Sequence, residues 1–128
     1  YIGEAYYARG NSKFNKKDKE GSCADWNKAN ELGVKLAKQM IISYCTFTPK
    51  TAEDFYMRAQ TKRRKEYKEA IDDYTQAIQL NPKYAEAYYY RGYCKLGAKD
   101  KEGACADWKK ANELKGGYAK DEIDKYCK

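Results

Sequence analysis

Cysteine has the most distinctive spacing of the residue types that could carry chemistry in this chain. Cys23 and Cys45 are 22 residues apart, and so are Cys105 and Cys127. Each pair links two segments that we expect to be neighbouring helices, and packed helices can bring two Cα atoms within disulfide range. Two disulfides would indicate a periplasmic or extracellular setting. The alternative is that all four are small buried thiols. Cys94 has no matching partner and is expected to be the odd thiol.

The remaining polar residues do not indicate catalysis or metal binding. The chain has no histidine, so the commonest general base is absent. No cysteines have the close Cys-x-x-Cys spacing of a metal site. We interpret Asp72 and Asp73 as solvated charges on an exposed helix face, and Gly116 and Gly117 lack the flanking residues of a phosphate loop. We therefore expect no enzyme activity, no metal and no cofactor.

The charge balance is basic, with 26 Lys and Arg against 19 Asp and Glu and a net charge of +7. Such an excess can attract nucleic acid, an acidic partner or an anionic membrane surface. Lys is spread through every segment and interleaved with acids, which is typical of a solvated helix surface. The one dense cluster, residues 62–65, is interpreted as a solvated turn, and the alternative is a contact with phosphate or an acidic peptide. Nucleic acid is therefore only a minor candidate partner, and no apolar run is long enough to span a membrane.

Two internal repeats organise the sequence. Residues 1–46 align without a gap with residues 83–128, so that Trp26 and Trp108 are 82 positions apart. A shorter period of 34 residues sits inside the longer one. It relates Ala70, Tyr74, Ala77 and Leu80 to Ala104, Trp108, Ala111 and Leu114. Because the apolar residues recur at three- and four-residue spacing, both repeats are predicted to be helical.

The 34-residue period resembles the tetratricopeptide repeat, a pair of antiparallel helices named A and B. In that family, small residues at positions 8, 20 and 27 let the helices approach closely, and an aromatic residue at position 24 fills the space between them. With Ala85 as position 1, these residues are Gly92, Ala104, Ala111 and Trp108. The corresponding residues are Gly10, Ser22, Ala29 and Trp26 in the first copy and Ala59, Ala70, Ala77 and Tyr74 in the middle copy. The resemblance implies an all-α fold in which the helix pairs stack as an α–α superhelix.

The expected helices follow from the repeat pattern. They cover residues 3–15, 18–32, 35–45, 51–63, 66–80, 85–97, 100–114 and 118–127. The third and the last follow helix B in matching positions and have the apolar edge of a capping helix. Residues 46–49 form the expected boundary, because the residue before Pro49 disfavours helix. We predict one repeat plus a cap-like helix in residues 1–46, and two repeats plus a C-terminal capping helix in residues 51–128.

The middle repeat departs from the family pattern. Its turn between helices A and B is predicted to be one residue shorter than in its neighbours, and residues 51–80 contain no Gly or Pro. Two separate helices are expected. The alternative is one long helix that exchanges half of the array with another molecule. An open apolar flank on the first helix would be a second route to self-assembly.

In the tetratricopeptide family, positions 2, 5, 9 and 12 of helix A point into a concave surface that binds other polypeptides. The resemblance places there Glu4, Tyr7, Asn11 and Phe14, then Glu53, Tyr56 and Gln60, then Glu86, Tyr89, Tyr93 and Leu96. A groove of Tyr rings flanked by amides and carboxylates can stack on side chains and hydrogen-bond an extended backbone. The alternative for Tyr7 and Tyr56 is packing against neighbouring repeats.

The nature of the ligand is indicated by the residues at these positions. Glu at position 2 in all three repeats favours a basic or amide-rich ligand. Some family members clamp a C-terminal carboxylate with Lys and Arg at positions 2, 5 and 6, where this chain has mostly Glu and Tyr. We therefore expect a scaffold or adaptor that binds another protein or peptide with the concave face of its A helices. The alternative is a structural module that forms homo-oligomers through the open N-terminal face or a swapped middle helix.

Overall fold

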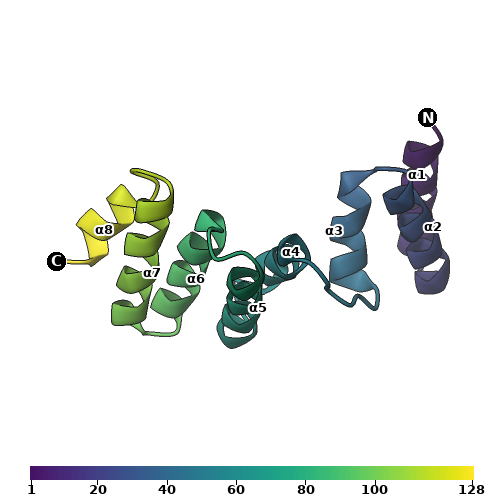
Figure 1. The fold of residues 1–128 in the computed structure, drawn as a ribbon. Helices are drawn as coiled ribbons and strands as arrows, with labels where there is room; N and C mark the ends of the chain where they lie inside the picture. The colour runs from purple at the N-terminus through teal and green to yellow at the C-terminus, as the bar shows by residue number, and fades with distance from the viewer. The chain divides into compact units, whose positions relative to one another are not determined.

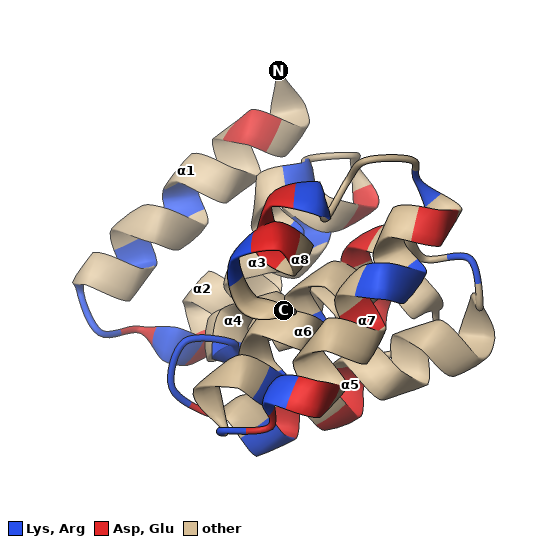
Figure 2. Cartoon of the chain, turned by 90° about the vertical axis from the view of Figure 1, so that its left-hand side faces the viewer, with Lys and Arg blue, Asp and Glu red and all other residues tan.

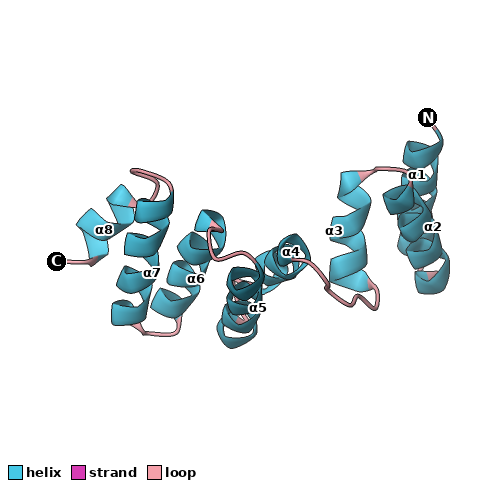
Figure 3. Cartoon of the chain, in the orientation of Figure 1, coloured by secondary structure: helices cyan, strands magenta, loops and turns pink.

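The computed structural model describes residues 1–128 and consists of helices and connecting loops (Figure 1, Figure 3). The helices are α1 (Ile2–Asn15), α2 (Lys19–Glu31), α3 (Lys35–Tyr44), α4 (Ala52–Lys62), α5 (Tyr67–Leu80), α6 (Ala85–Gly97), α7 (Lys101–Leu114) and α8 (Lys120–Tyr126). They divide into two compact units, Tyr1–Thr48 with α1 to α3 and Pro49–Lys128 with α4 to α8. The all-α prediction is confirmed, and each helix begins and ends within two residues of its predicted bounds.

Charged residues of both signs occur along individual helices (Figure 2). This distribution agrees with the solvated helix surface that the sequence indicated. None of the eight helices combines the length and the apolar character that a membrane span requires.

Each unit is built from pairs of packed helices. In the first unit α1 packs on α2, and α3 packs on α2 in turn. In the second unit α4 packs on α5 and α6 on α7, while α5 also packs on α6 and α7 on α8. The middle repeat therefore has two separate helices, as predicted, and the single long helix is not formed.

The predicted shortening of the middle turn is wrong. Helix α4 has 11 residues where α6 has 13, and the loop at residues 63–66 is longer than those at residues 16–18 and 98–100. The two tight turns depend on Lys17 and Lys99, whose φ angles of 65° and 68° lie in the left-handed region. The middle loop has no such residue. The middle repeat is one residue shorter than its neighbours, and this shortening affects its helix A, α4, and not the loop.

The core of each repeat is an aromatic ring on helix B that lies against a small residue on helix A. Trp26, Tyr74 and Trp108 are fully buried. A Cβ atom on Gly10 would lie 2.7 Å from the Trp26 ring, and one on Gly92 would lie 2.6 Å from Nε1 of Trp108. In the middle repeat the ring is the smaller one of Tyr74, so Ala59 fits at the position that Gly10 and Gly92 have in the other repeats.

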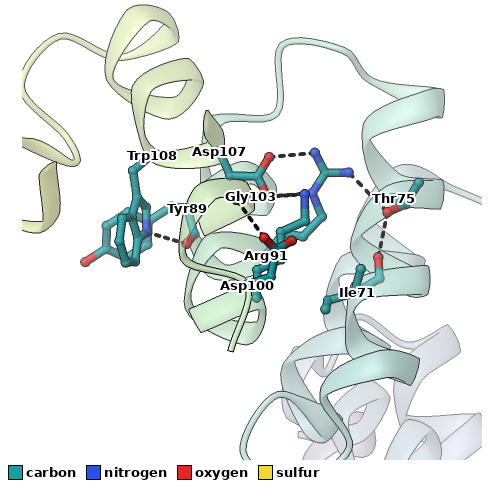
Figure 4. Close-up of polar contacts among 9 residues, drawn as sticks. Ile71, Thr75, Tyr89, Arg91, Asp100, Gly103, Asp107 and Trp108 are labelled. Atoms are coloured by element: carbon teal, nitrogen blue, oxygen red, sulfur yellow. Dashed lines mark hydrogen bonds and ion pairs between the residues drawn. The ribbon is translucent and has the colours of Figure 1, made fainter. Parts of the chain in front are cut away.

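A buried aspartate on helix B joins the two helices of every repeat. Its carboxylate accepts two hydrogen bonds, of 2.7 to 2.9 Å, from the Nε and Nη2 atoms of one arginine on helix A. A lysine one turn further along helix A lies 3.1 to 3.8 Å from the same carboxylate. The three sets are Arg9, Lys13 and Asp25; Arg58, Lys62 and Asp73; and Arg91, Lys95 and Asp107. Figure 4 shows the Arg91–Asp107 pair of the third set, in which Arg91 also donates to Thr75 Oγ1 on α5.

The interpretation of Asp73 as a solvated charge is therefore wrong. Asp73 is 5% exposed and ion-paired with Arg58, whereas its neighbour Asp72 is exposed as expected. The pattern that could have identified the pair is Arg-x-x-x-Lys on helix A followed by Asp-aromatic on helix B, which recurs in all three repeats. A buried carboxylate without such a partner would be strongly destabilising.

Both matched cysteine pairs are joined as disulfides. The Cα atoms are 5.9 Å apart in Cys23–Cys45 and 5.7 Å apart in Cys105–Cys127. Each bond ties helix B to the residue that follows the next helix, so α3 and α8 are both fixed on the preceding repeat. Cys94 is the buried free thiol, and burial raises its pKa to about 11, so it stays protonated near neutral pH.

Removing either disulfide should destabilise its own unit. A cross-link that closes a loop of this length contributes about 3 kcal/mol, chiefly by restricting the unfolded chain. We expect Cys23→Ser with Cys45→Ser to lower the urea midpoint reported by Trp26 fluorescence in a Trp108→Phe background. The matched control is Cys105→Ser with Cys127→Ser, which should leave the Trp26 transition unchanged. An unchanged midpoint in the first variant would show that the bond does not stabilise this unit.

The Arg9–Asp25 pair should make the first unit sensitive to acid. The hydrogen bond from Arg9, with Lys13 also close, lowers the pKa of Asp25 from 3.8 to about 2. Because the folded pKa is lowered, the pair stabilises the folded state above pH about 4, and this contribution is lost as pH falls from about 4 to about 2. In the Trp108→Phe background, the urea midpoints reported by Trp26 for the chain with Asp25 and for Asp25→Asn should converge over that range. Parallel pH dependence in the two proteins would contradict the assignment.

Candidate functional site

The predicted ligand-facing residues of the first unit are largely engaged within that unit. Asn11 accepts a hydrogen bond of 2.9 Å from Nε1 of Trp26. Phe14 contacts both the Trp26 and the Tyr44 ring, with centroid distances of 5.5 Å and 4.6 Å. Tyr7 is half-buried against the same core, and among the four predicted positions only Glu4 is exposed. These side chains hold α3 and the core in place.

In the second unit, five tyrosine rings make a continuous row. Consecutive ring centroids are 4.9, 6.3, 5.1 and 4.7 Å apart. In order, the rings are Tyr84, Tyr56, Tyr90, Tyr89 and Tyr118, and we call them the tyrosine row. They come from α4, from α6 with its N-cap, and from the loop before α8. All five are half-buried, so each ring is exposed to solvent in part.

Two further rings contact the row, Tyr74 beside Tyr56 and Tyr93 beside Tyr89. Tyr74 is fully buried under Tyr56, with centroids 5.8 Å apart, and its hydroxyl donates to Oε1 of Gln60. Tyr93 contacts Trp108 at 5.2 Å. Gln60 and Tyr93 were both predicted as ligand-facing, and the structure gives each a partner inside the unit. Leu96 likewise packs against the core around Trp108.

Glu122 on α8 fixes one end of the row. Its Oε2 atom accepts hydrogen bonds from the hydroxyls of Tyr89, at 2.9 Å, and Tyr93, at 2.6 Å. Sequence reasoning missed Glu122, because the last helix was considered only for its apolar edge. It also missed Tyr84, Tyr90 and Tyr118. Two of these could have been found from the 34-residue period, because Tyr84 and Tyr118 are 34 residues apart and each lies just before a helix.

The first unit has no equivalent of the tyrosine row, although its sequence is a duplicate of residues 83–128. At the places of Tyr84, Tyr90, Tyr118 and Glu122 it has Ile2, Ala8, Leu36 and Met40. Only Tyr7 matches a member of the row, Tyr89. The duplication therefore kept the frame of the repeat in both units but placed the aromatic surface in the second.

Carboxylates line the start of α4 and α6 beside the row. An open pocket of about 630 Å³ is lined by Thr51, Ala52, Glu53, Asn81, Lys83, Tyr84 and Glu86. Burial raises the pKa of Tyr84 to about 12, and the charges of Glu53 and Glu86 contribute. Burial also raises the pKa values of Tyr56, Tyr89 and Tyr118, so these three hydroxyls are protonated near neutral pH.

The basic cluster at residues 62–65 is divided between structural contacts and solvent. Lys62 contacts Glu69 and Asp73, and the Arg63 guanidinium lies 4.9 Å from the centroid of the Tyr90 ring. Arg64 and Lys65 are exposed. Two of the four cations therefore stabilise the second unit. No group of three or more Cys, Asp or Glu side chains is placed to hold a metal ion.

Comparison with known proteins identifies the repeat. Residues 62–97 match the family model described as TPR repeat, where TPR denotes the tetratricopeptide repeat. A comparison with curated protein sequences found no match.

Several solved structures have a similar fold. The second TPR domain of the human RPAP3 protein, in complex with the HSP70 peptide SGPTIEEVD, has 24% identity and a TM-score of 0.59, covering 96% of this chain and 92% of that one. The MamA protein has 22% identity and a TM-score of 0.60, with 98% and 87% covered. YrrB, a TPR protein with an unusual peptide-binding site, has 16% identity and a TM-score of 0.62, with 95% and 74% covered. These similarities confirm the all-helical repeat fold.

Loss of Glu122 should loosen α8. Glu122→Ala removes the acceptor for two tyrosine hydroxyls, and the expected loss of stability is about 1 kcal/mol because the site is partly exposed to water. Hydrogen exchange of the α8 amides should become faster. The control is Asp121→Ala, which removes an exposed acid from the same helix. Equal exchange rates in the two variants would argue against a role for Glu122 in holding α8.

Proposed function

Because the chain is a tetratricopeptide-repeat protein, we propose that it is a protein-binding scaffold whose second unit binds an extended peptide across the tyrosine row. The observation that carries this proposal is the row itself, five half-buried rings in contact with one another. Tyrosine offers a large rigid contact area with a polar tip, and it is enriched where proteins bind one another.

The similar structures support a peptide as the ligand. The RPAP3 domain is bound to an HSP70 peptide, and YrrB is described as having a peptide-binding site. In this chain Tyr56, Tyr89 and Glu86, all predicted as ligand-facing, lie along the row or at its border. The hydroxyls and carboxylates around the rings can pair with the backbone of an extended segment.

The pocket beside the row has two carboxylates, Glu53 and Glu86, against one cation, Lys83, and this balance favours a basic ligand. The RPAP3 peptide ends in Glu-Glu-Val-Asp, and such an acidic tail would meet Glu53 and Glu86 here. A Lys or Arg side chain would instead be attracted by both carboxylates and could lie over the Tyr84 ring as a cation–π contact. We therefore infer a peptide with at least one Lys or Arg that enters the pocket at the start of α4 and α6.

Peptide display tests both the site and the ligand class. A random library selected on the whole chain should yield peptides enriched in Lys and Arg. Calorimetry should then show that the affinity of Glu53→Lys with Glu86→Lys for these peptides is at least about tenfold weaker than that of the wild type. Binding to the wild type should also weaken in high salt. The control is Glu102→Lys with Glu113→Lys, which makes the same charge change at exposed positions of α7. It should bind as the wild type does.

Two results would overturn the proposal. One is a selection without basic residues among the peptides that bind. The other is equal loss of affinity in both charge-reversed variants, because the effect would then come from net charge and not from the site. Circular dichroism of both variants establishes that they are folded before affinity is compared.

A further inference from the structure

The middle repeat has a half-buried guanidinium beside the tyrosine row that no carboxylate of the chain neutralises. Three of the five arginines bond a buried aspartate: Arg9, Arg58 and Arg91. Arg63 is half-buried and makes no ion pair, and its guanidinium lies 4.9 Å from the centroid of the Tyr90 ring. Taking a charge partly out of water without an opposite charge beside it is unfavourable. An anion supplied by a ligand would therefore be stabilised at this place.

The position of Arg63 follows from the spacing of residues on α4. Residues at intervals of three, four and three share one face of a helix, and here they are Glu53, Tyr56, Gln60 and Arg63. Arg63 is the C-cap of α4 and keeps helical dihedral angles, with φ at −62° and ψ at −14°. Its carbonyl oxygen also accepts a bond of 3.7 Å from Sγ of Cys94, which fixes this end of α4 on α6. The face therefore begins with a carboxylate and ends with a guanidinium.

The ring contact leaves the hydrogen-bonding groups of Arg63 available. A guanidinium has five N–H donors in a planar fork, and this fork matches the two oxygens of a carboxylate. The Tyr90 ring attracts the positive charge, but the side chain of Arg63 donates no hydrogen bond within the chain. A carboxylate at this place would form charge-assisted bonds, which are stronger than bonds between neutral groups.

On the basis of the peptide-binding function proposed above, we infer that the ligand carries two opposite charges, a Lys or Arg for Glu53 and Glu86 and an Asp or Glu for Arg63. Glu53 and Arg63 are ten residues apart in the sequence. This separation corresponds to about 15 Å along a helix. An extended peptide advances about 3.3 Å per residue, so its two charges should lie about four or five residues apart.

A ligand with only one kind of charge fits this face less well. A peptide that is basic along its whole length would bring a cation to Arg63, and a wholly acidic one would bring carboxylates to Glu53 and Glu86. Like charges brought together in this way oppose binding. The face therefore discriminates against both kinds of peptide, and the spacing of the two charges adds to its specificity.

Peptides that differ only in the place of one carboxylate test the inference. One Lys-containing sequence from the display selection is synthesised with an amidated C-terminus and with a single Asp moved along it. Calorimetry should show the tightest binding when the Asp lies about four or five residues from the Lys. Replacing that Asp by Asn should weaken binding to the wild type about tenfold, because a bond between two charged groups is lost. Arg63→Gln should bind the Asp and Asn peptides with equal affinity.

The control is Arg64→Gln, which removes the same charge at the neighbouring exposed position and should keep the preference for Asp. Circular dichroism establishes that both variants are folded. An equal preference for Asp in Arg63→Gln and in the wild type, or no preferred place for the Asp, would overturn the inference. The proposed function would still stand in that case if Glu53→Lys with Glu86→Lys weakens binding of the same peptides. It would fail as well if that variant bound them as the wild type does.

Discussion

The aspartate on helix B of each repeat is buried, and a buried carboxylate is tolerated only when it is paired and hydrogen-bonded. The arginine that pairs with it lies on helix A and bonds both carboxylate oxygens, which restricts the rotation and the register of one helix on the other. In that register, Gly92 lies against Trp108, while Tyr89 and Tyr93 reach Glu122 on α8. The core and the tyrosine row therefore depend on the same pair.

The capping helices explain why the two units differ in their aromatic surfaces although one duplicates part of the other. Both α3 and α8 are fixed by a disulfide, and each covers the Trp of its repeat with a Tyr ring, Tyr44 or Tyr126. Only α8 and the loop before it supply Glu122 and Tyr118 to the neighbouring A helix. A few substitutions on a retained frame are enough to give the two copies different aromatic surfaces.

The sequence predicted the helices and the cysteine pairing well, because repeats and periodicity are properties of the chain alone. The contacts of single polar residues were predicted poorly. Asp72 and Asp73 look alike in sequence, and only the position of Arg58 on another helix makes one of them buried. Asn11 and Gln60 were assigned to a ligand, yet each accepts a bond from a buried ring of its own repeat. Buried Trp and Tyr need such acceptors, and which side chain provides them depends on tertiary packing.

We propose that the ligand binds the tyrosine row of the second unit, and NMR of the whole chain with ¹³C-labelled tyrosine tests this most directly. A Lys-containing peptide from the display selection would be titrated into it, with ring signals assigned by Tyr→Phe variants. The account predicts shifts in Tyr56, Tyr84, Tyr89, Tyr90 and Tyr118, and none in Tyr7 or Tyr44 of the first unit. Shifts confined to the first unit, or spread equally over both, would contradict it.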